Sequence, residues 1–125
     1  MTRKFNQYLG KAGHFAVMSE FLMLGWNVAK PEVDVGDDIF VVQDNNGTLR
    51  RVQVKTAGST IHQLTFSEQF QVPIKQLKSI TTIPVHYVFI VRYDNIWTQP
   101  VIIRQDYLLD HFENNKLLVL NMKGV

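Results

Sequence analysis

The chain has 125 residues, which is enough to bury one hydrophobic core and too few for two. Hydrophobic residues make up 46% of the chain and charged residues 19%, and this balance excludes an intrinsically disordered protein. The lack of cysteine excludes disulfides and thiolate metal sites, and the formal net charge of +2 is too small to indicate nucleic-acid binding by itself. No apolar run is long enough to cross a membrane, and the first residues lack the apolar stretch of a secretory signal. We therefore expect one cytoplasmic domain over residues 1–125.

A long helix is predicted at the start of the chain. Apolar residues recur at helical spacing between residues 5 and 24, and few polar residues interrupt the second half of this stretch. A helix that is apolar around most of its circumference is expected to be buried on most of it. Gly25 would end the helix because glycine accepts the left-handed conformation. Residues 26–29 are then expected to form a short extended segment.

A β-hairpin follows. Residues 38–43 and 49–56 have strand character, and Asp44-Asn45-Asn46-Gly47 between them is typical of a turn because Asn and Gly tolerate positive φ. If these four residues form the loop, Gln43 pairs with Thr48.

This register decides which side chains share a face of the hairpin. It places Asp38 opposite Gln53. Because side chains alternate along a strand, Gln53 and Lys55 share the face of Asp38, whereas Val52 and Val54 point to the other face.

The second half of the chain predicts further strands and two helices. Strands are expected at residues 61–66, 85–91, 96–103 and 117–120, and helices at residues 73–80 and 106–112. Pro100 indicates that part of the strand at 96–103 lies at a sheet edge, since proline cannot donate a hydrogen bond there. The order of these elements predicts an α/β sandwich with a mixed sheet.

The hairpin carries the residues needed for metal-assisted phosphodiester hydrolysis. Mg²⁺ prefers oxygen ligands, usually one or two carboxylates with water and phosphate. The Asp38 carboxylate, the Gln53 side-chain carbonyl and the Val54 backbone carbonyl can supply such oxygens, and Asp34 in the preceding acidic loop can serve as a secondary ligand. Lys55 can orient or deprotonate a water and stabilise charge on a phosphate. The alternative is that Asp38 caps a strand and Lys55 merely pairs with it.

One pattern joins these residues over positions 10–57. A helix is followed by Gly25-Trp26, an acidic loop that Pro31 leads, Asp38 at the start of a strand, and Gln53-Val54-Lys55 on the next strand. This pattern resembles the PD-(D/E)XK nucleases, in particular the branch that includes intron-encoded homing endonucleases and small nuclease-like proteins. More distantly, it is similar to archaeal Holliday-junction resolvases.

The resemblance implies a fold and an activity. The fold would be a restriction-endonuclease-like three-layer sandwich of the α/β (α+β) class, with a mixed β-sheet flanked by helices and an α-β-β-β-α-β core. The activity would be hydrolysis of DNA with Mg²⁺ or Mn²⁺. Asp38 and Gln53 would bind the metal, with Gln53 in place of a carboxylate as in some members, and Lys55 would be the catalytic lysine. A homodimer would supply the two sites that cleavage of two strands requires.

The first helix departs from the family pattern. The family often has a glutamate about eleven residues before the glycine that ends the helix, and here that position is His14. Histidine prefers softer ions than Mg²⁺. Glu20 lies about 120° around the helix from His14, so it could substitute only if the helix rotates or bends.

Arg51 and Lys11 are the expected contacts to DNA. Arg51 shares the face of Gln53 and Lys55, whereas alternation sends Arg50 to the other face. Two alternatives to a nuclease stay open. One is a nuclease-fold protein that has lost cleavage and binds nucleic acid or a protein partner. The other is an interaction module that exposes residues 96–103 as a sheet edge.

Overall fold

The computed structural model describes residues 3–32, 38–59, 66–78, 83–93, 95–112 and 117–124. In chain order, its helices and strands are α1 (Arg3–Met23), β1 (Asn27–Ala29), β2 (Ile39–Val42), β3 (Leu49–Ser59), β4 (Phe66–Pro73), α2 (Ile74–Leu77), β5 (Val85–Tyr93), β6 (Ile96–Trp97), β7 (Val101–Arg104), α3 (Gln105–Phe112) and β8 (Leu117–Gly124). Of the described helices, none is long and apolar enough to cross a membrane.

The strands form a mixed sheet and a separate ribbon. The sheet has the order β1-β2-β3-β5, and both β6 and β7 pair with the outer side of β5. Among the described strands of this sheet, only the β3–β5 pair is parallel, and the other pairs are antiparallel. The ribbon consists of β4 and β8, which pair antiparallel.

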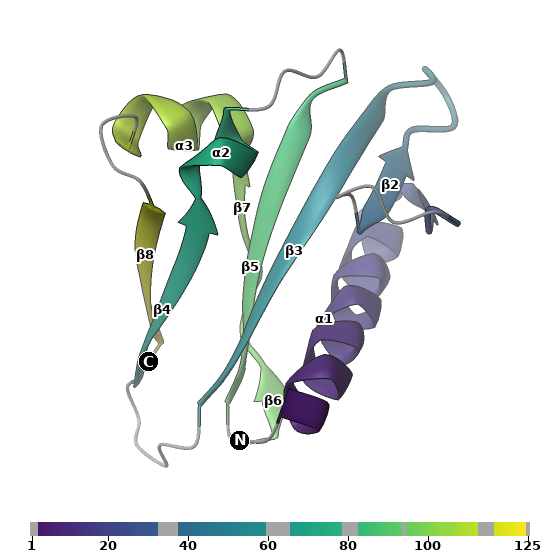
Figure 1. Ribbon diagram of the computed structural model, residues 1–125. Coiled ribbons are helices and arrows are strands. Elements are labelled where there is room, and N and C mark those ends of the chain that lie inside the picture. The colour runs from purple at the N-terminus through teal and green to yellow at the C-terminus, as the bar shows by residue number, and fades with distance from the viewer. Residues whose placement is uncertain are drawn as a thin grey trace.

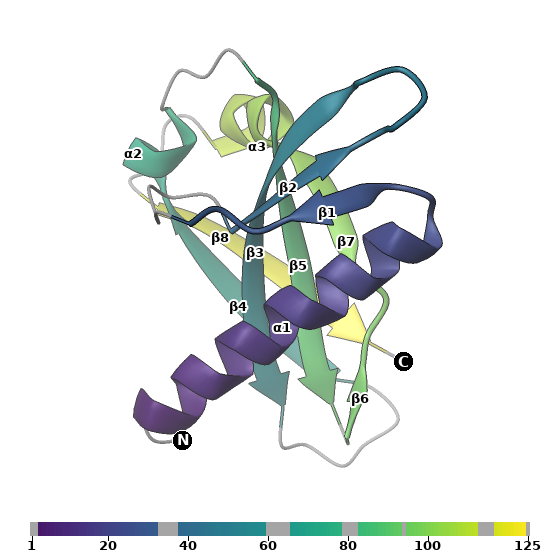
Figure 2. The same ribbon diagram turned by 90° about the vertical axis from the view of Figure 1, so that its right-hand side faces the viewer.

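Three layers result from this arrangement. Figure 1 shows α1 on one side of the sheet, and the β4–β8 ribbon with α2 and α3 on the other side. Figure 2 shows α1 running obliquely across its face of the sheet, below the curled strands β1 and β2. The predicted mixed sheet flanked by helices is therefore confirmed.

Two hydrophobic clusters lie on opposite faces of the sheet, because side chains alternate along β3 and β5. The buried cluster beneath α1 consists of Val17, Phe21, Ile39, Val41, Val52, Val54, Val88 and Ile90. The buried cluster on the opposite face consists of Phe70, Val72, Leu77, Val85, Tyr87, Phe89, Val91 and Leu108. Full burial of one such side chain contributes roughly 1.5–3 kcal/mol, so these clusters hold α1 and β4 against the sheet.

The β2–β3 hairpin has the predicted register. Ile39 pairs with Val52, and the Gln43 N–H donates a 2.9 Å hydrogen bond to the Thr48 carbonyl. Gly47 in the loop has a φ of 71°, a left-handed value that glycine adopts without steric cost. Turn chemistry in the sequence was therefore sufficient to align the two strands.

Helix α1 is buried along one side only. Val17 and Phe21 face the sheet and are 1% and 8% exposed, whereas Tyr8, Phe15 and Leu22 are 66%, 60% and 53% exposed. The prediction that this helix is buried around most of its circumference is wrong. One sheet face covers one stripe of a helix, so the outer stripe stays open to solvent despite its apolar composition.

The strand predicted at 96–103 is two strands. Trp97 on β6 pairs with Arg92, and Val101 on β7 pairs with Phe89. The chain therefore advances four residues from Trp97 to Val101 while β5 spans only three residues between the paired positions. At the interruption, Thr98 exchanges hydrogen bonds with β5 through its hydroxyl and its N–H. One extra residue in an edge strand is a bulge, and Pro100, which lacks an N–H, favours it.

Three further boundaries differ from the prediction. The strand predicted at 61–66 appears as β4 and begins only at Phe66; residues 61–65 lie outside the described residues. The helix predicted to reach residue 80 has four residues, Ile74–Leu77, and residues 79–80 are likewise outside the described part. The last strand extends beyond residue 120 because it pairs with all of β4.

Candidate functional site

Asp38 lies directly before β2, where the ladder between β2 and β3 ends. Its N–H donates a 3.0 Å hydrogen bond to the Val52 carbonyl, and its Oδ2 accepts a 2.7 Å hydrogen bond from the Val54 N–H. The Asp38 side chain is 15% exposed.

Val54 lies on β3 beyond the last described pair of the β2–β3 ladder. N–H groups alternate sides along β3, and the Arg51 N–H donates to the Pro84 carbonyl on the side of β5. Val54, three residues later, therefore points its N–H to the side of β2, where Asp38 receives it. The Val54 carbonyl leaves the strand on the same side as its N–H, so a backbone oxygen accompanies the Asp38 carboxylate on this side of β3.

Lys55 is the next residue on β3, and its side chain leaves the opposite face from that of Val54. Burial lowers the pKa of the Lys55 ammonium from its ordinary value of 10.5, and the nearby Asp38 carboxylate opposes this by raising it. The net shift is downward, so Lys55 releases a proton more readily than a surface lysine does. Because the Asp38 carboxylate affects the pKa of Lys55, the two charged groups lie near each other, at the segment of β3 that contains Val54 and Lys55.

The described register of the hairpin ends where Ile39 pairs with Val52, and the Asp38 N–H also donates to the Val52 carbonyl. The predicted pairing of Asp38 with Gln53 is therefore not part of the described ladder. Gln53 is half-buried and shares its face of β3 with Lys55.

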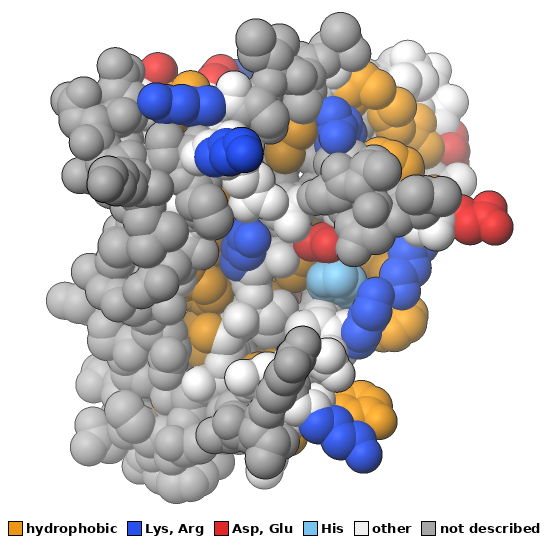
Figure 3. Space-filling view, in the orientation of Figure 1, with side chains coloured by type: hydrophobic (Ala, Val, Ile, Leu, Met, Phe, Trp, Pro, Cys, Tyr) orange, Lys and Arg blue, Asp and Glu red, His pale blue; other side chains and the backbone are white. Residues whose placement is uncertain are grey.

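His14 reaches Asp38 from α1. Its Nε2 lies 3.6 Å from the Asp38 Oδ2, and its side chain is 16% exposed. Figure 3 shows a histidine and an acidic side chain next to each other on the face turned to the viewer, with basic side chains on both sides of them. His14, the position at which the resemblance implies a glutamate, therefore lies next to Asp38.

Gly13 allows this close approach of α1 to β3. It is buried, and a Cβ at Gly13 would overlap the Thr56 side chain, with the Thr56 Cγ2 at 2.9 Å. Only a residue without a Cβ fits here, and the next residue along the helix is His14. Neither Gly13 nor Thr56 was among the predicted site residues. The available signal was a single glycine within a helical pattern, which usually has a packing reason.

The two predicted DNA contacts lie on different elements. Arg51 is half-buried on β3, and Lys11 is exposed on α1, one helical turn before His14. Asp34, the predicted secondary ligand, lies outside the described residues.

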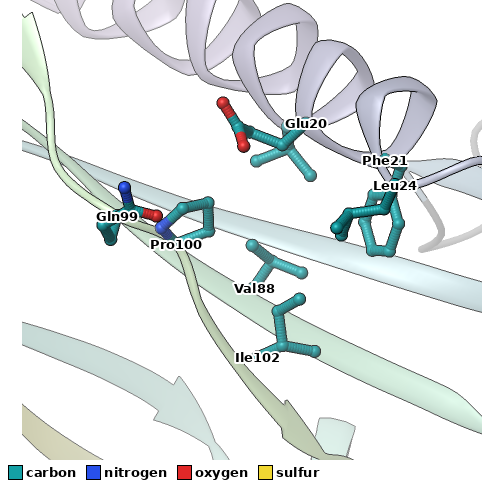
Figure 4. A pocket seen from close by; sticks show the side chains of 8 residues that line it. Glu20, Phe21, Leu24, Val88, Gln99, Pro100 and Ile102 are labelled. Carbon is teal, nitrogen blue, oxygen red and sulfur yellow. The ribbon is translucent and has the colours of Figure 1, made fainter.

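Glu20 lies over a different part of the sheet. A hollow of about 170 Å³ separates α1 from the segment that joins β6 to β7, with Val88 and Ile102 in its floor. Figure 4 shows Glu20 at the rim of this hollow, on the side of Gln99 and Pro100. The structure thus brings His14 to Asp38 and turns Glu20 elsewhere, as expected for helix positions about 120° apart.

These elements define an α+β fold with a carboxylate, an amide and a lysine on its central hairpin. Among solved structures, the chain is similar to a bacterial homing endonuclease, I-Ssp6803I, with a TM-score of 0.55. The sequences are 16% identical, and the match covers 91% of this chain and 73% of that chain. This likeness establishes the fold. No family model and no curated protein matches the sequence.

Proposed function

We propose that the protein is a metal-dependent endonuclease of the PD-(D/E)XK type that hydrolyses phosphodiester bonds in DNA. One observation carries the proposal: the Asp38 carboxylate and the Lys55 ammonium are electrostatically coupled around Val54, beyond the last described pair of the β2–β3 ladder. A phosphate at this position would meet a carboxylate, a backbone carbonyl and a lysine with a lowered pKa.

Asp38, Gln53 and the Val54 carbonyl are the proposed ligands of Mg²⁺ or Mn²⁺. Among the described residues, no three His, Cys, Asp or Glu side chains gather into a metal cluster. Mg²⁺ sites for phosphate chemistry use as few as one or two carboxylates and take further oxygens from water and substrate, so one carboxylate with two neutral oxygens fits this ion. The metal, when bound, would polarise the phosphate and acidify a bound water. Asp34 and His14 are proposed as accessory ligands.

Lys55 has the proposed role of assisting the attacking water. Because its pKa is lowered, a larger fraction of Lys55 is neutral near neutral pH than for an exposed lysine, and a neutral amine can accept the proton of water. Once protonated, it would stabilise the charge that develops on the phosphate. The Asp38 carboxylate would attract the protonated form of Lys55.

DNA is the proposed partner, with Lys11 and Arg51 as phosphate contacts. The exposed Lys11 side chain lies on the same helix as His14, so it can reach DNA that approaches Asp38. Residues 1–125 are proposed to act as one domain in the cytoplasm.

A second copy of the chain is the other proposed partner, and α1 offers a surface for it. Tyr8, Phe15 and Leu22 are exposed and recur every seven residues, with exposed Ala12 and Ser19 between them. This is the spacing of a coiled-coil seam, and a twofold axis pairs one such surface with itself. Antiparallel pairing is favoured on charge. It brings the basic first half of α1, with Lys4 and Lys11, to the negative end of the partner helix dipole.

Cleavage of DNA tests the proposed activity. Supercoiled plasmid, branched DNA and single-stranded DNA are incubated with Mg²⁺ or Mn²⁺ and with wild type, Asp38→Ala or Lys55→Ala. Two exposed positions on other elements serve as matched controls, Asp110→Ala and Lys78→Ala. We expect metal-dependent cleavage that both site variants lose and both controls retain.

The contact between His14 and Asp38 supports an alternative, a nuclease-fold protein that binds nucleic acid without cleaving it. The His14 imidazole, 3.6 Å from the Asp38 Oδ2, can pair with the carboxylate and thereby compete with a metal ion for it. Folded protein that binds DNA in a salt-dependent manner, yet cuts none of these substrates with either metal, would establish this alternative. Protein that binds no DNA at any salt concentration would instead indicate an interaction module, since Ile102 on the edge strand β7 is 46% exposed.

A further inference from the structure

Three nitrogen-bearing side chains lie together on the α1 face of the sheet, at the end where β3 and β5 begin. His86 on β5 pairs directly with Arg104 on β7 and with Val52 on β3, and Arg50 precedes Val52 by two residues. Alternation places Arg50, His86 and Arg104 on the face that carries Val52. Arg104 lies directly opposite His86 on an antiparallel neighbour, about 5 Å away at Cβ. Arg50 lies on the strand at the other side of β5, so the two arginines flank His86, and their long side chains can reach a small group bound beside it.

His86 is the centre of this cluster. Its Nδ1 is buried and has no hydrogen-bond partner among the described residues. Burial, and then the positive charges of Arg50 and Arg104, lower the pKa of His86 below its ordinary value of 6.5, while Asp106 opposes this by raising it. These are the charged groups that face His86 from β3, β7 and α3. This environment therefore disfavours the protonated His86 imidazole, and an anion bound beside it would stabilise the protonated form.

The arginines retain donors that could bind such an anion. Arg104 is held by Asp106 through two hydrogen bonds, Nε to Oδ1 at 3.1 Å and Nη2 to Oδ2 at 3.0 Å. A guanidinium has five N–H donors, so three remain on Arg104. Arg50 donates from Nη1 to the Leu49 carbonyl at 3.2 Å, which leaves most of its donors unused by that bond. These hydrogen bonds thus orient both arginines and leave other N–H donors of each guanidinium for a ligand.

The cluster lies close to the candidate site without being part of it. Figures 1 and 2 show that the β2–β3 hairpin bends toward the α1 side of the sheet near the start of β5. Arg50 and Val54 are four residues apart on β3, or about 13 Å at 3.3 Å per residue. A nucleic acid that places one phosphate at Asp38 can therefore place another near Arg50.

We propose that Arg50, His86 and Arg104 bind one phosphate of the DNA backbone, at a distance from the phosphate that is cleaved. The inference rests on the proposed function for its choice of DNA. Two guanidinium groups with an imidazole suit a tetrahedral oxyanion, because planar forks of N–H donors match phosphate oxygens. The chemistry would be the same for inorganic phosphate, so the test separates these two sources.

Binding of a fluorescein-labelled duplex is measured by anisotropy in Ca²⁺, at several salt concentrations, independently of cleavage. The variant is Arg50→Gln/Arg104→Gln, and the matched control is Arg92→Gln, an arginine that stacks on Trp97 at the far end of β5. Loss of one phosphate contact should lower the salt slope of log K by about 0.9 and weaken binding roughly eightfold at 0.1 M salt. The control should keep both values of wild type. A double variant with wild-type slope and affinity, or a wild type that binds no duplex, overturns the proposal.

The His86 imidazole provides a second measurement by NMR titration. A bound phosphate stabilises the protonated ring, so duplex DNA should raise the pKa of His86 in wild type and not in the double variant. If inorganic phosphate raises this pKa while the double variant binds DNA as wild type does, the site belongs to a free oxyanion and the DNA assignment is wrong. Failure of the proposed nuclease is recognised separately. In that case no substrate is cut, yet DNA binding still depends on Arg50 and Arg104.

Discussion

The Asp38 carboxylate accepts a 2.7 Å hydrogen bond from the Val54 N–H, beyond the last described pair of the β2–β3 ladder. The Asp38 side chain thus accepts the N–H of the buried Val54, which a backbone carbonyl of β2 would accept in a regular ladder. Asp38 therefore stabilises the edge of the sheet in addition to its proposed role as a metal ligand. Variants at this position must separate the two roles.

Asp38→Asn and Asp38→Ala should differ in stability and agree in activity. Asparagine keeps an oxygen that can accept the Val54 N–H, whereas alanine leaves that buried donor unsatisfied at a cost of about 1–3 kcal/mol. Both variants lose the carboxylate, so both should lose cleavage. Urea unfolding and plasmid cleavage measure the two effects. Wild-type cleavage by Asp38→Asn would remove Asp38 from the proposed metal ligands.

Lys55→Met should stabilise the protein in a pH-dependent manner. The folded pKa of Lys55 lies below 10.5, so between that lowered value and 10.5 the unfolded chain binds more protons, and wild-type stability rises with pH. Methionine keeps the aliphatic packing and has no charge to bury. The Tm of Lys55→Met should exceed that of wild type at pH 7, and the difference should shrink as the pH approaches 10.5. The exposed Lys78→Met is the control, and an equal pH-dependent gain there would contradict the assigned cause.

His14→Glu should strengthen the response to Mg²⁺. A second carboxylate beside Asp38 repels it in the absence of metal and adds a hard ligand in its presence. We expect a lower Tm than wild type without metal, a larger rise of Tm with Mg²⁺, and a preference that moves from Mn²⁺ toward Mg²⁺. Thermal unfolding with and without each metal measures this. Gln7→Glu adds the same charge at an exposed position on α1 and should show none of these changes.

Gly13→Ala should destabilise the protein although alanine is the better helix former. The intrinsic gain of about 1 kcal/mol for alanine in a helix is opposed by overlap with Thr56, and overpacking typically costs about 1–3 kcal/mol. Thr56→Ala removes most of the overlapping atoms, so Gly13→Ala/Thr56→Ala should recover stability. Chemical denaturation of both single variants and the double variant measures the coupling. Additive effects would show that α1 and β3 do not meet here.

Tyr8→Glu/Leu22→Glu should convert the proposed dimer to a monomer that remains folded. Both side chains are more than half exposed, so the charge costs little in the monomer and is buried only at a helix–helix interface. Sedimentation velocity measures the mass, and circular dichroism checks the helix. Ile96→Glu, at another exposed apolar position, is the control and should stay dimeric. Wild type that sediments as a monomer at all concentrations would exclude this interface.

The sequence by itself determined the register of the β2–β3 hairpin between Ile39 and Gln43 on one strand and Thr48 and Val52 on the other. Turn residues that tolerate positive φ set the loop length, and strict alternation along two strands then decides which side chains share a face. Both rules act between residues that are close in the chain. The prediction of a buried strand at 85–91 was equally local, since a mostly apolar run of β-branched and aromatic residues is typical of a buried strand.

Only the tertiary structure decided which residues from distant parts of the chain lie next to the β2–β3 hairpin. His14 meets Asp38 because Gly13 lets α1 approach Thr56, and this depends on which side of the helix packs against the sheet and how closely. Arg50, His86 and Arg104 share one face of the sheet because β3, β5 and β7 are neighbours, an order that no local pattern encodes. The exposed stripe on α1 was missed for the same reason. The apolar composition of a helix shows how much of its surface could be buried, but the number of layers that pack against the helix decides how much is buried.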